Sequence, residues 1–169
     1  MNEFLYNGLT IREHLLKLSE NSNKQFAQTL NPGVENVLGL RIPDLRKLAA
    51  GIAKTYLSTA STFYMEERML QGMVLGYIKP DNDIEKYLAR VTRFVKIINS
   101  WSVCDTFKFA GGKKYVSSHA DRIWQYLKTF IHAEGEYEVR FGVVMAMEYF
   151  IDDAHIDELL NLLDGIRHE

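Results

Sequence analysis

An indole and a carboxylate stand four residues apart in the segment 99–105. If this segment is helical, Trp101 and Asp105 lie on one face of it, because residues four apart are neighbours on a helix surface. An indole attracts a cation to its negative face, and an ionised Asp stabilises positive charge that develops in a reaction. The pair is therefore suited to a cationic ligand. On geometry alone, a core Trp beside an Asp that caps a helix or pairs locally is the more common arrangement.

Local signals indicate where this helix begins and ends. Asn99 and Ser100 are residue types whose short side chains accept from free N–H groups at a helix start. The glycine pair at 111–112 is a typical stop signal. The sequence therefore predicts one helix from Trp101 to the glycine pair.

Basic residues near expected helix ends are candidate phosphate ligands. Helix N-termini together with Lys or Arg bind phosphates without reading base sequence. Each such residue is otherwise a solvated surface charge. The candidate DNA-binding residues are Arg41, Arg46, Lys47, Lys113, Lys114 and Arg140.

Arg140 differs from the other basic residues because it interrupts an apolar run, between Val139 and Phe141. A charge in such surroundings needs a partner or a ligand. Its partner would be an acidic residue such as Asp105 or Glu148. The sequence leaves this ion pair and a ligand contact equally open.

Other chemistries find little support. The histidines are scattered, none lies in an H-E-x-x-H pattern, and Asp152 three residues before His155 is more typical of a cap than of a metal site. Gly112-Lys113 lacks the first glycine of a phosphate loop, since Phe107 occupies that position. Cys104 has no paired His, and its neighbours suggest burial rather than a nucleophilic thiol. We expect no metal site.

Apolar residues recur at helical spacing through most of the chain, and no segment alternates as a strand would. Helices are expected over about 11–18, 24–30, 42–52, 61–78, 84–98, 101–110, 123–131, 137–151 and 153–163. The methionines at 65, 69 and 73, with Tyr77, form a stripe typical of core packing. The helix over 137–151 is nearly continuous in apolar residues and is expected to be central and buried.

The expected helices fall into pairs that start near residues 42, 84, 119 and 156, which are 42, 35 and 37 residues apart. Such spacings are typical of HEAT-like repeats, in which each pair buries its face against the next and the stack acquires a concave side. We predict an all-α fold, a right-handed superhelix of HEAT-like antiparallel helix pairs, forming a single domain over 1–169.

Composition excludes several classes of protein. The chain of 169 residues is 47% hydrophobic and 25% charged, which is typical of one globular domain. No apolar run approaches the eighteen or so residues of a membrane span, and the start does not resemble a signal peptide. A single cysteine, Cys104, excludes an internal disulfide and suits the cytoplasm. The net charge of −2 argues against coating nucleic acid by charge alone and leaves a local basic face open.

Three segments, in this order and spacing, resemble the bacterial HEAT-like DNA alkylation repair family, the DNA glycosylases that release alkylated purines. They are Gly39-Leu40-Arg41-Ile42-Pro43-Asp44-Leu45-Arg46, Ser100-Trp101-Ser102-Val103-Cys104-Asp105, and Glu138-Val139-Arg140-Phe141 at the entry to a buried helix. The resemblance spans roughly residues 35 to 165.

The resemblance implies an α-solenoid whose concave groove binds duplex DNA containing alkylated bases, with no metal or organic cofactor. Separately, we expect the protein to be a monomer. By position, Asp105 matches the catalytic carboxylate and Trp101 an aromatic residue of the lesion-facing cleft. An N3- or N7-alkylated purine is cationic and leaves readily. Cleavage builds positive charge on the sugar, which an ionised Asp stabilises while it orients or deprotonates the attacking water.

The chain departs from the family in two places. The family has two consecutive arginines where this chain has Arg140-Phe141, and the cleft-lining arginine aligns with Phe141. Arg140 would substitute for it only if the helix is rotated or the side chain reaches round. The family also implies further helices after Glu169, so we expect either a piece of a longer protein or a short relative with a more open groove. Two other functions stay open: a non-catalytic relative that binds damaged or branched DNA, and a helical-repeat scaffold for another protein.

Overall fold

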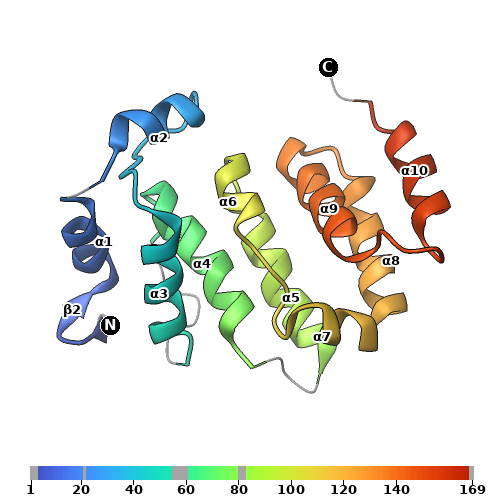
Figure 1. The fold of residues 1–169 in the computed structure, drawn as a ribbon, viewed down its shortest axis with the longest axis horizontal. Helices are drawn as coiled ribbons and strands as arrows, with labels where there is room; N and C mark the ends of the chain where they lie inside the picture. Colours follow the sequence, from blue (N-terminus) through green and yellow to red (C-terminus); the bar gives the residue numbers. More distant parts are fainter. Residues whose placement is uncertain (1–3, 21, 55–60, 80–82, 168–169) are drawn as a thin grey trace.

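The computed structural model describes residues 4–20, 22–54, 61–79 and 83–167. Over these residues ten helices follow one another in chain order across the molecule (Figure 1). They are α1 (Ile11–Ser19), α2 (Lys24–Leu30), α3 (Ile42–Ile52), α4 (Met65–Tyr77), α5 (Ile84–Val95), α6 (Trp101–Asp105), α7 (Gly112–Ser118), α8 (Ala120–Ile131), α9 (Glu136–Tyr149) and α10 (Ile156–Asp164). The predicted all-α, helical-repeat fold is confirmed.

The repeat spacing expected from the sequence matches the observed helix starts. α3, α5, α8 and α10 begin at residues 42, 84, 120 and 156. The most extensive packing is between α3 and α4 and between α8 and α9, so these are true repeat pairs. The middle unit differs, because the short α6 packs on α4 and α9 rather than mainly on α5. α6 therefore lies between the two large pairs.

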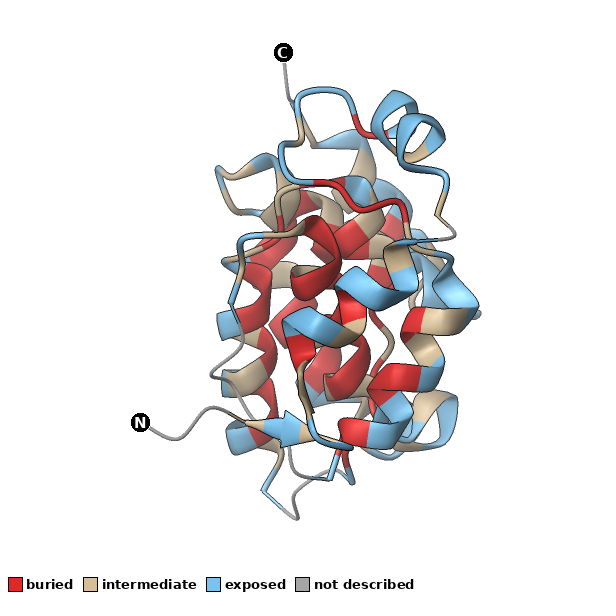
Figure 2. Ribbon diagram, turned by 90° about the vertical axis from the view of Figure 1, so that its left-hand side faces the viewer, coloured by how far each residue is buried: buried red, intermediate tan, exposed pale blue. Residues whose placement is uncertain are grey.

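The core forms where the helices face one another, and their outer sides are exposed (Figure 2). Met65, Met69 and Met73 are buried as the stripe predicts, whereas Tyr77 at its end is exposed. The expected burial of the helix over 137–151 is only half right. α9 buries one face, which includes Met145, but Met147 on its other side is exposed.

The expectation of no strands is wrong at the N-terminus. Two-residue strands, β1 (Leu5–Tyr6) and β2 (Leu9–Thr10), pair antiparallel. Asn7 and Gly8 connect them with φ of 50° and 80°, the left-handed conformations that an Asn-Gly hairpin turn requires. Strands this short cannot show alternation, so the turn dipeptide was the only available signal.

Three predicted helix ends need correction. The helix expected from residue 61 begins at Met65, and the last helix begins at Ile156 after a turn in which Asp152 accepts the N–H groups of Ala154 and His155. The helix from Trp101 ends at Asp105, not at the glycine pair, which instead begins α7 with Gly111 at φ 73°.

α6 ends early because of the five residues that follow it. The Thr106 hydroxyl donates to the carbonyls of Ser102 and Val103, so it competes for the carbonyl groups at the helix end. Phe107 and Phe109 are then fully buried, and their rings pack with centroids 5.2 Å apart. Burial of these two rings draws the chain out of the helical path.

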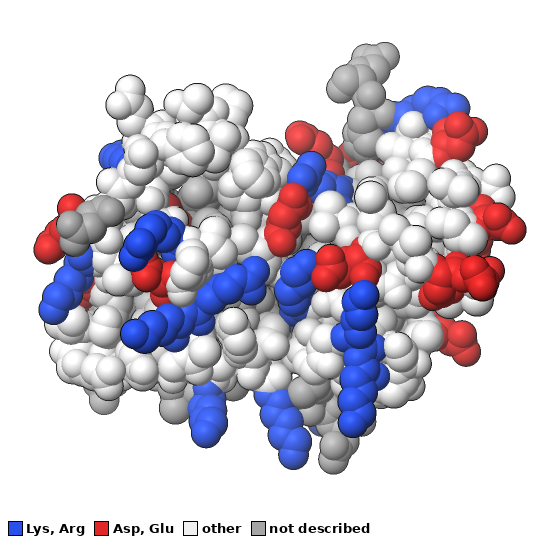
Figure 3. Space-filling model, viewed as in Figure 1, with Lys and Arg blue, Asp and Glu red and all other residues white. Residues whose placement is uncertain are grey.

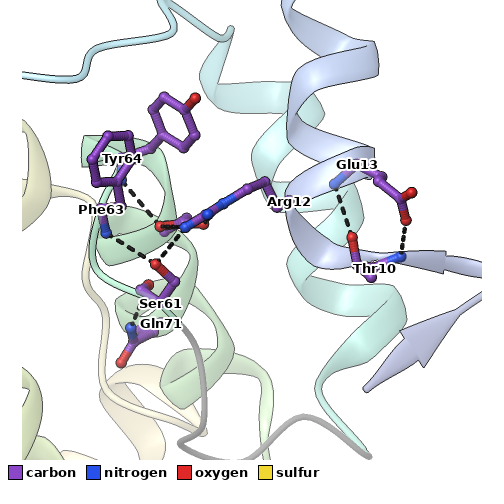
Figure 4. Close-up of polar contacts among 8 residues, drawn as sticks. Thr10, Arg12, Glu13, Ser61, Phe63, Tyr64 and Gln71 are labelled. Carbon is purple, nitrogen blue, oxygen red and sulfur yellow. Dashed lines mark hydrogen bonds and ion pairs between the residues drawn. The ribbon is translucent and has the colours of Figure 1, made fainter. Parts of the chain in front are cut away.

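An ion pair ties the N-terminal hairpin and α1 to the repeats. Arg12 reaches from α1 to the buried carboxylate of Glu67 in the first turn of α4, with its Nε donating to Oε1 at 3.0 Å (Figure 4). Its Nη2 donates to the Ser61 hydroxyl, and the guanidinium lies 5.5 Å from the Phe63 ring centroid. Thr10 and Glu13 form a capping box that starts α1. The N-terminal elements are therefore fixed to α4.

Candidate functional site

α6 presents Trp101 and Asp105 from one turn of helix. The buried hydroxyl of Ser100 caps the helix by accepting the N–H of Val103, which confirms the predicted start. Val103 and Cys104 point into the core and hold the helix in place. Trp101 and Asp105, four residues apart, are left at the surface side of the helix.

Asp105 pairs with Arg140 of α9 through two parallel hydrogen bonds. Arg140 Nε donates to Oδ1 at 3.0 Å and Nη2 donates to Oδ2 at 2.6 Å. The two side chains are 33% and 39% exposed, so the pair is open to solvent on one side. The bonds to Asp105 raise the pKa of Arg140 above its ordinary value. Of the partners predicted for Arg140, Asp105 is the one observed, since Glu148 pairs with Lys108 at 3.0 Å.

The burial of Phe141 accounts for the direction in which Arg140 points. Phe141 is fully buried, and its ring packs 5.4 Å from that of Phe107 and 5.3 Å from that of Phe130. Consecutive side chains on a helix point in directions about 100° apart, so a buried Phe141 leaves Arg140 directed at α6. The arginine therefore faces the candidate carboxylate of Asp105.

Trp101 is 40% exposed, so it is not the core residue that the alternative from the sequence required. Its indole Nε1 donates to the carbonyl of Leu30 at 2.8 Å. Leu30 is the last residue of α2, 71 positions earlier in the chain. Trp101 therefore joins α6 to the end of α2 and keeps much of its ring accessible.

A pocket of about 590 Å³ opens beside these two residues. α2, α3, α4 and α6 contribute its walls, and both Trp101 and Asp105 line it. Its apolar lining includes Phe26 of α2, Leu40 before α3, and Met69 of α4. The candidate site is therefore a pocket with a carboxylate and an indole on one side and apolar groups on the others.

A residue that the sequence did not single out, Glu66, fixes one wall of this pocket. Its carboxylate is 1% exposed and accepts the backbone N–H groups of Leu38, Gly39 and Leu40, the closest at 2.7 Å from Gly39. Gly39 has φ +80°, and an added Cβ would lie 2.5 Å from the Cα of Lys24. Only glycine allows this loop and α2 to approach so closely.

The basic residues predicted to bind DNA fall into two groups. Arg41 lines the pocket, and with Lys47 of α3 it also lines a second pocket of about 750 Å³ towards α1. Arg41 Nε donates to Asp44 at 2.9 Å, and Arg46, also on α3, is half-buried. Lys113 and Lys114 are exposed on α7, at the lower edge of the molecule and away from α2 (Figure 1). The structure therefore pairs Arg140 with Asp105 and places Arg41 in the lining of the same pocket, whereas Lys113 and Lys114 lie elsewhere.

Charge is unevenly distributed over the face seen in Figure 3. Lys and Arg side chains lie mainly over α3 to α7, Asp and Glu gather over the C-terminal helices, and the surface over α2 carries few charges. The upper edge is hollowed between α2 and the C-terminal helices, and α6 lies at the base of this hollow. The candidate site thus lies between α2, whose surface carries few charges, and a basic strip over α3 to α7.

The described residues offer little support for thiol chemistry or metal binding. Burial, followed by the nearby charge of Asp105, raises the pKa of the Cys104 thiol to about 12, so it is protonated and not a nucleophile. Within the described ranges, no group of three or more His, Cys, Asp or Glu side chains is placed to bind a metal ion. Nor does any helix in those ranges have the length and apolar character of a membrane span.

Comparison with known families decides what kind of protein has this arrangement. The family model of the DNA alkylation repair enzymes matches residues 11–168. The chain belongs to this family. No curated protein and no solved structure matches it. Membership in the DNA alkylation repair enzyme family indicates a role in DNA repair, with DNA as the partner, and the matched segment includes α2, α6 and α9.

Proposed function

We propose that the chain is a DNA glycosylase that hydrolyses the N-glycosidic bond of cationic N3- and N7-alkylated purines in duplex DNA. The observation that carries this proposal is the partly exposed carboxylate of Asp105, held by Arg140 and lining one pocket with Trp101. This arrangement occurs in a member of the DNA alkylation repair enzyme family.

Asp105 is proposed as the catalytic carboxylate. As the glycosidic bond breaks, positive charge develops on the sugar, and a fixed carboxylate stabilises it without having to reorient. The same group orients or deprotonates the attacking water. The two-bond contact with Arg140 holds the carboxylate plane in one direction, so Arg140 positions the reacting group.

Trp101 is proposed to contact the alkylated nucleotide. A cationic base is attracted to the indole face, and the exposed part of the ring is available for this contact. The bond from its Nε1 to Leu30 fixes the ring plane. The indole therefore meets the DNA in one orientation.

Phosphate binding is proposed for Arg41, Arg46 and Lys47 of the α3 region, with Lys113 and Lys114 as more distant contacts. Such contacts position DNA without reading its sequence. We expect a cytoplasmic, monomeric enzyme that needs no cofactor.

One observation favours a second candidate, a DNA-binding relative that does not cleave the glycosidic bond. Both oxygens of Asp105 are already engaged by Arg140. If DNA binding does not break one of the hydrogen bonds between Arg140 and Asp105, the carboxylate has fewer lone pairs left to orient a water molecule. Binding that depends strongly on salt without base release would support this candidate.

The experiment that tests the proposal is release of 7-methylguanine from methylated duplex DNA by the wild type and by Asp105→Asn. Glu85→Gln is the matched control, because Glu85 of α5 also accepts two hydrogen bonds from an arginine, Arg122 of α8. We expect release by the wild type and the control, and loss in Asp105→Asn. Equal release by all three proteins would refute the role of Asp105.

A further inference from the structure

A groove between α1 and α3 adjoins the candidate site. It is the second pocket, of about 750 Å³, and residues of α1, of α3 and of the N-terminal hairpin line it. We call it the α1–α3 groove. Ser22 and Arg41 line both this groove and the pocket that contains Asp105, so the two hollows are neighbours. A long ligand bound at Asp105 can therefore extend into the groove.

The N-terminal hairpin bounds the groove and is fixed to both helices. The Tyr6 hydroxyl lies directly against Gly51 of α3, where an added Cβ would clash with it. On the side of α1, Nε2 of His14 donates to the Tyr6 carbonyl at 2.6 Å, and the two ring centroids are 5.5 Å apart. The groove is therefore bounded by three elements that are held to one another.

Two lysines of the groove are available to bind an anion. Lys17 of α1 and Lys47 of α3 are exposed, and neither forms an ion pair with a residue that the structure describes. Of the two carboxylates in the lining, that of Asp44 is already bound by Arg41 at 2.9 Å, and that of Glu20 is exposed after the end of α1. The lysines therefore leave the groove with a positive charge that its own carboxylates do not neutralise.

The groove also offers apolar surface, which separates a nucleic-acid backbone from a small free anion. Leu9 of the hairpin, Leu18 of α1 and Leu48 of α3 line it together with the lysines. A sugar-phosphate backbone alternates charged phosphates with apolar deoxyribose carbons, so it can use both kinds of surface. An inorganic anion would use only the lysines, which come from two different helices.

The opposite side of the candidate site is acidic. Residues 115–169, which include α8, α9 and α10, contain eleven Asp and Glu but only four Lys and Arg, and these acids gather over the C-terminal helices in Figure 3. All four basic side chains of this part are already bound by carboxylates or by backbone carbonyl groups: Arg122, Lys128, Arg140 and Arg167. Because DNA carries one negative charge per about 1.7 Å of its axis, this surface disfavours it.

We propose that the duplex is held on one side of Asp105 only: its backbone lies in the α1–α3 groove, with Lys17 and Lys47 as phosphate ligands, and the C-terminal helices bind none of it. The inference rests on the proposed function for its ligand, duplex DNA, and adds where the DNA beside the lesion is held. It gives α1 and the N-terminal hairpin a part in DNA binding, which the spacing of motifs in the sequence did not indicate.

The test measures the affinity for an unmodified, fluorescently labelled duplex by anisotropy at several salt concentrations. Each phosphate contact contributes about 0.9 to the slope of log affinity against log salt. Lys17→Gln and Lys47→Gln should each make the slope shallower by about one, and the double variant by about two. Lys86→Gln is the matched control, since Lys86 is an exposed lysine of α5 outside the groove. Arg167→Gln removes the same charge at the C-terminal end, and both controls should keep the wild-type slope.

The outcomes separate the groove from other ligands and from the proposed function. Unchanged slopes in Lys17→Gln and Lys47→Gln would overturn the inference, and so would a shallower slope in Arg167→Gln, because DNA would then reach the C-terminal helices. If the two lysine variants kept the slope but lost binding of deoxyguanosine monophosphate in calorimetry, the groove would be a nucleotide site, which also overturns it. Release of 7-methylguanine by the wild type is scored separately. Shallower slopes without base release would support the groove and refute the glycosylase, and base release with unchanged slopes would do the reverse.

Discussion

Two of the arginine–carboxylate pairs that join helices among the described residues are built differently. Arg12 of α1 binds Glu67 of α4, and Arg140 of α9 binds Asp105 of α6, each through two side-chain hydrogen bonds. Glu67 is only 3% exposed, and its carboxylate also accepts the N–H of Tyr64. Asp105 is one third exposed and lines a pocket.

The difference separates a carboxylate that holds the fold from one that can meet a ligand. Glu67 is almost completely covered by its surroundings, so its carboxylate offers no surface to DNA. Asp105 keeps one side open, and its pair stabilises the fold little because exposed ion pairs are worth at most about 1 kcal/mol. Both carboxylates are paired with an arginine, so the pairing does not distinguish them. The exposure of its carboxylate to solvent therefore identifies Asp105 as the candidate catalytic group.

The largest expected effect is on activity at Asp105. Asp105→Asn removes the negative charge and keeps the shape, so base release should fall by about 10³-fold. The free energy of unfolding should change by less than about 1 kcal/mol, because the pair is partly exposed. Single-turnover base release and urea unfolding measure the two quantities. If Asp105→Asn lost much unfolding free energy without a specific loss of base release, Asp105 would have a structural role like that of Glu67.

Glu67→Gln is expected to show the opposite pattern. The neutral amide cannot replace a buried carboxylate that accepts from both Arg12 and Tyr64, so the protein should lose about 2 kcal/mol of unfolding free energy at pH 7. Base release measured well below the melting temperature should match that of the wild type. Urea unfolding at pH 7 and base release are the measurements, and a variant as stable as the wild type would contradict this role.

The sequence predicted the helices well because their burial follows local periodicity. The methionines of α4 mark its buried face, and Thr10 starts α1 through a contact with Glu13, only three residues away. The end of α6 was missed because it depends on burial of Phe107 and Phe109 against distant helices. Helical spacing carries no information about such long-range packing.

The site was predictable as a set of residues but not as an arrangement. Helical spacing placed Trp101 and Asp105 together, whereas the choice between Asp105 and Glu148 as partner of Arg140 depended on which side α9 presents. The Glu66 contacts with the loop at 38–40 and the bond from Trp101 to Leu30 join segments at least 26 residues apart. These contacts shape the pocket, and they cannot be predicted from the spacing of neighbouring residues in the sequence.

Arg140→Lys tests whether the open pair needs its two-bond geometry. Lys keeps the positive charge but cannot hold both oxygens of Asp105 in one plane, so base release should fall by about tenfold. Arg122→Lys is the matched control, since Arg122 makes the same two-bond contact with Glu85. Single-turnover base release measures the effect. Equal rates of base release for Arg140→Lys and the wild type would mean that a positive charge at position 140 is enough to position Asp105, without the two-bond contact.

The smallest expected effect is a difference in acid sensitivity. Burial alone would raise the pKa of Glu67, but the hydrogen bonds from Arg12, Tyr64 and Ser61 together outweigh burial and lower it. A carboxyl group with a lowered pKa in the folded state stabilises the protein above its ordinary pKa and loses this contribution as the pH falls through the lowered value. The wild type should therefore be more stable than Glu67→Gln at neutral pH, and the gap should narrow below about pH 4.5. Urea unfolding of both proteins between pH 7 and pH 3 measures the gap, and a gap that stays constant would show that shape rather than charge makes Glu67 important.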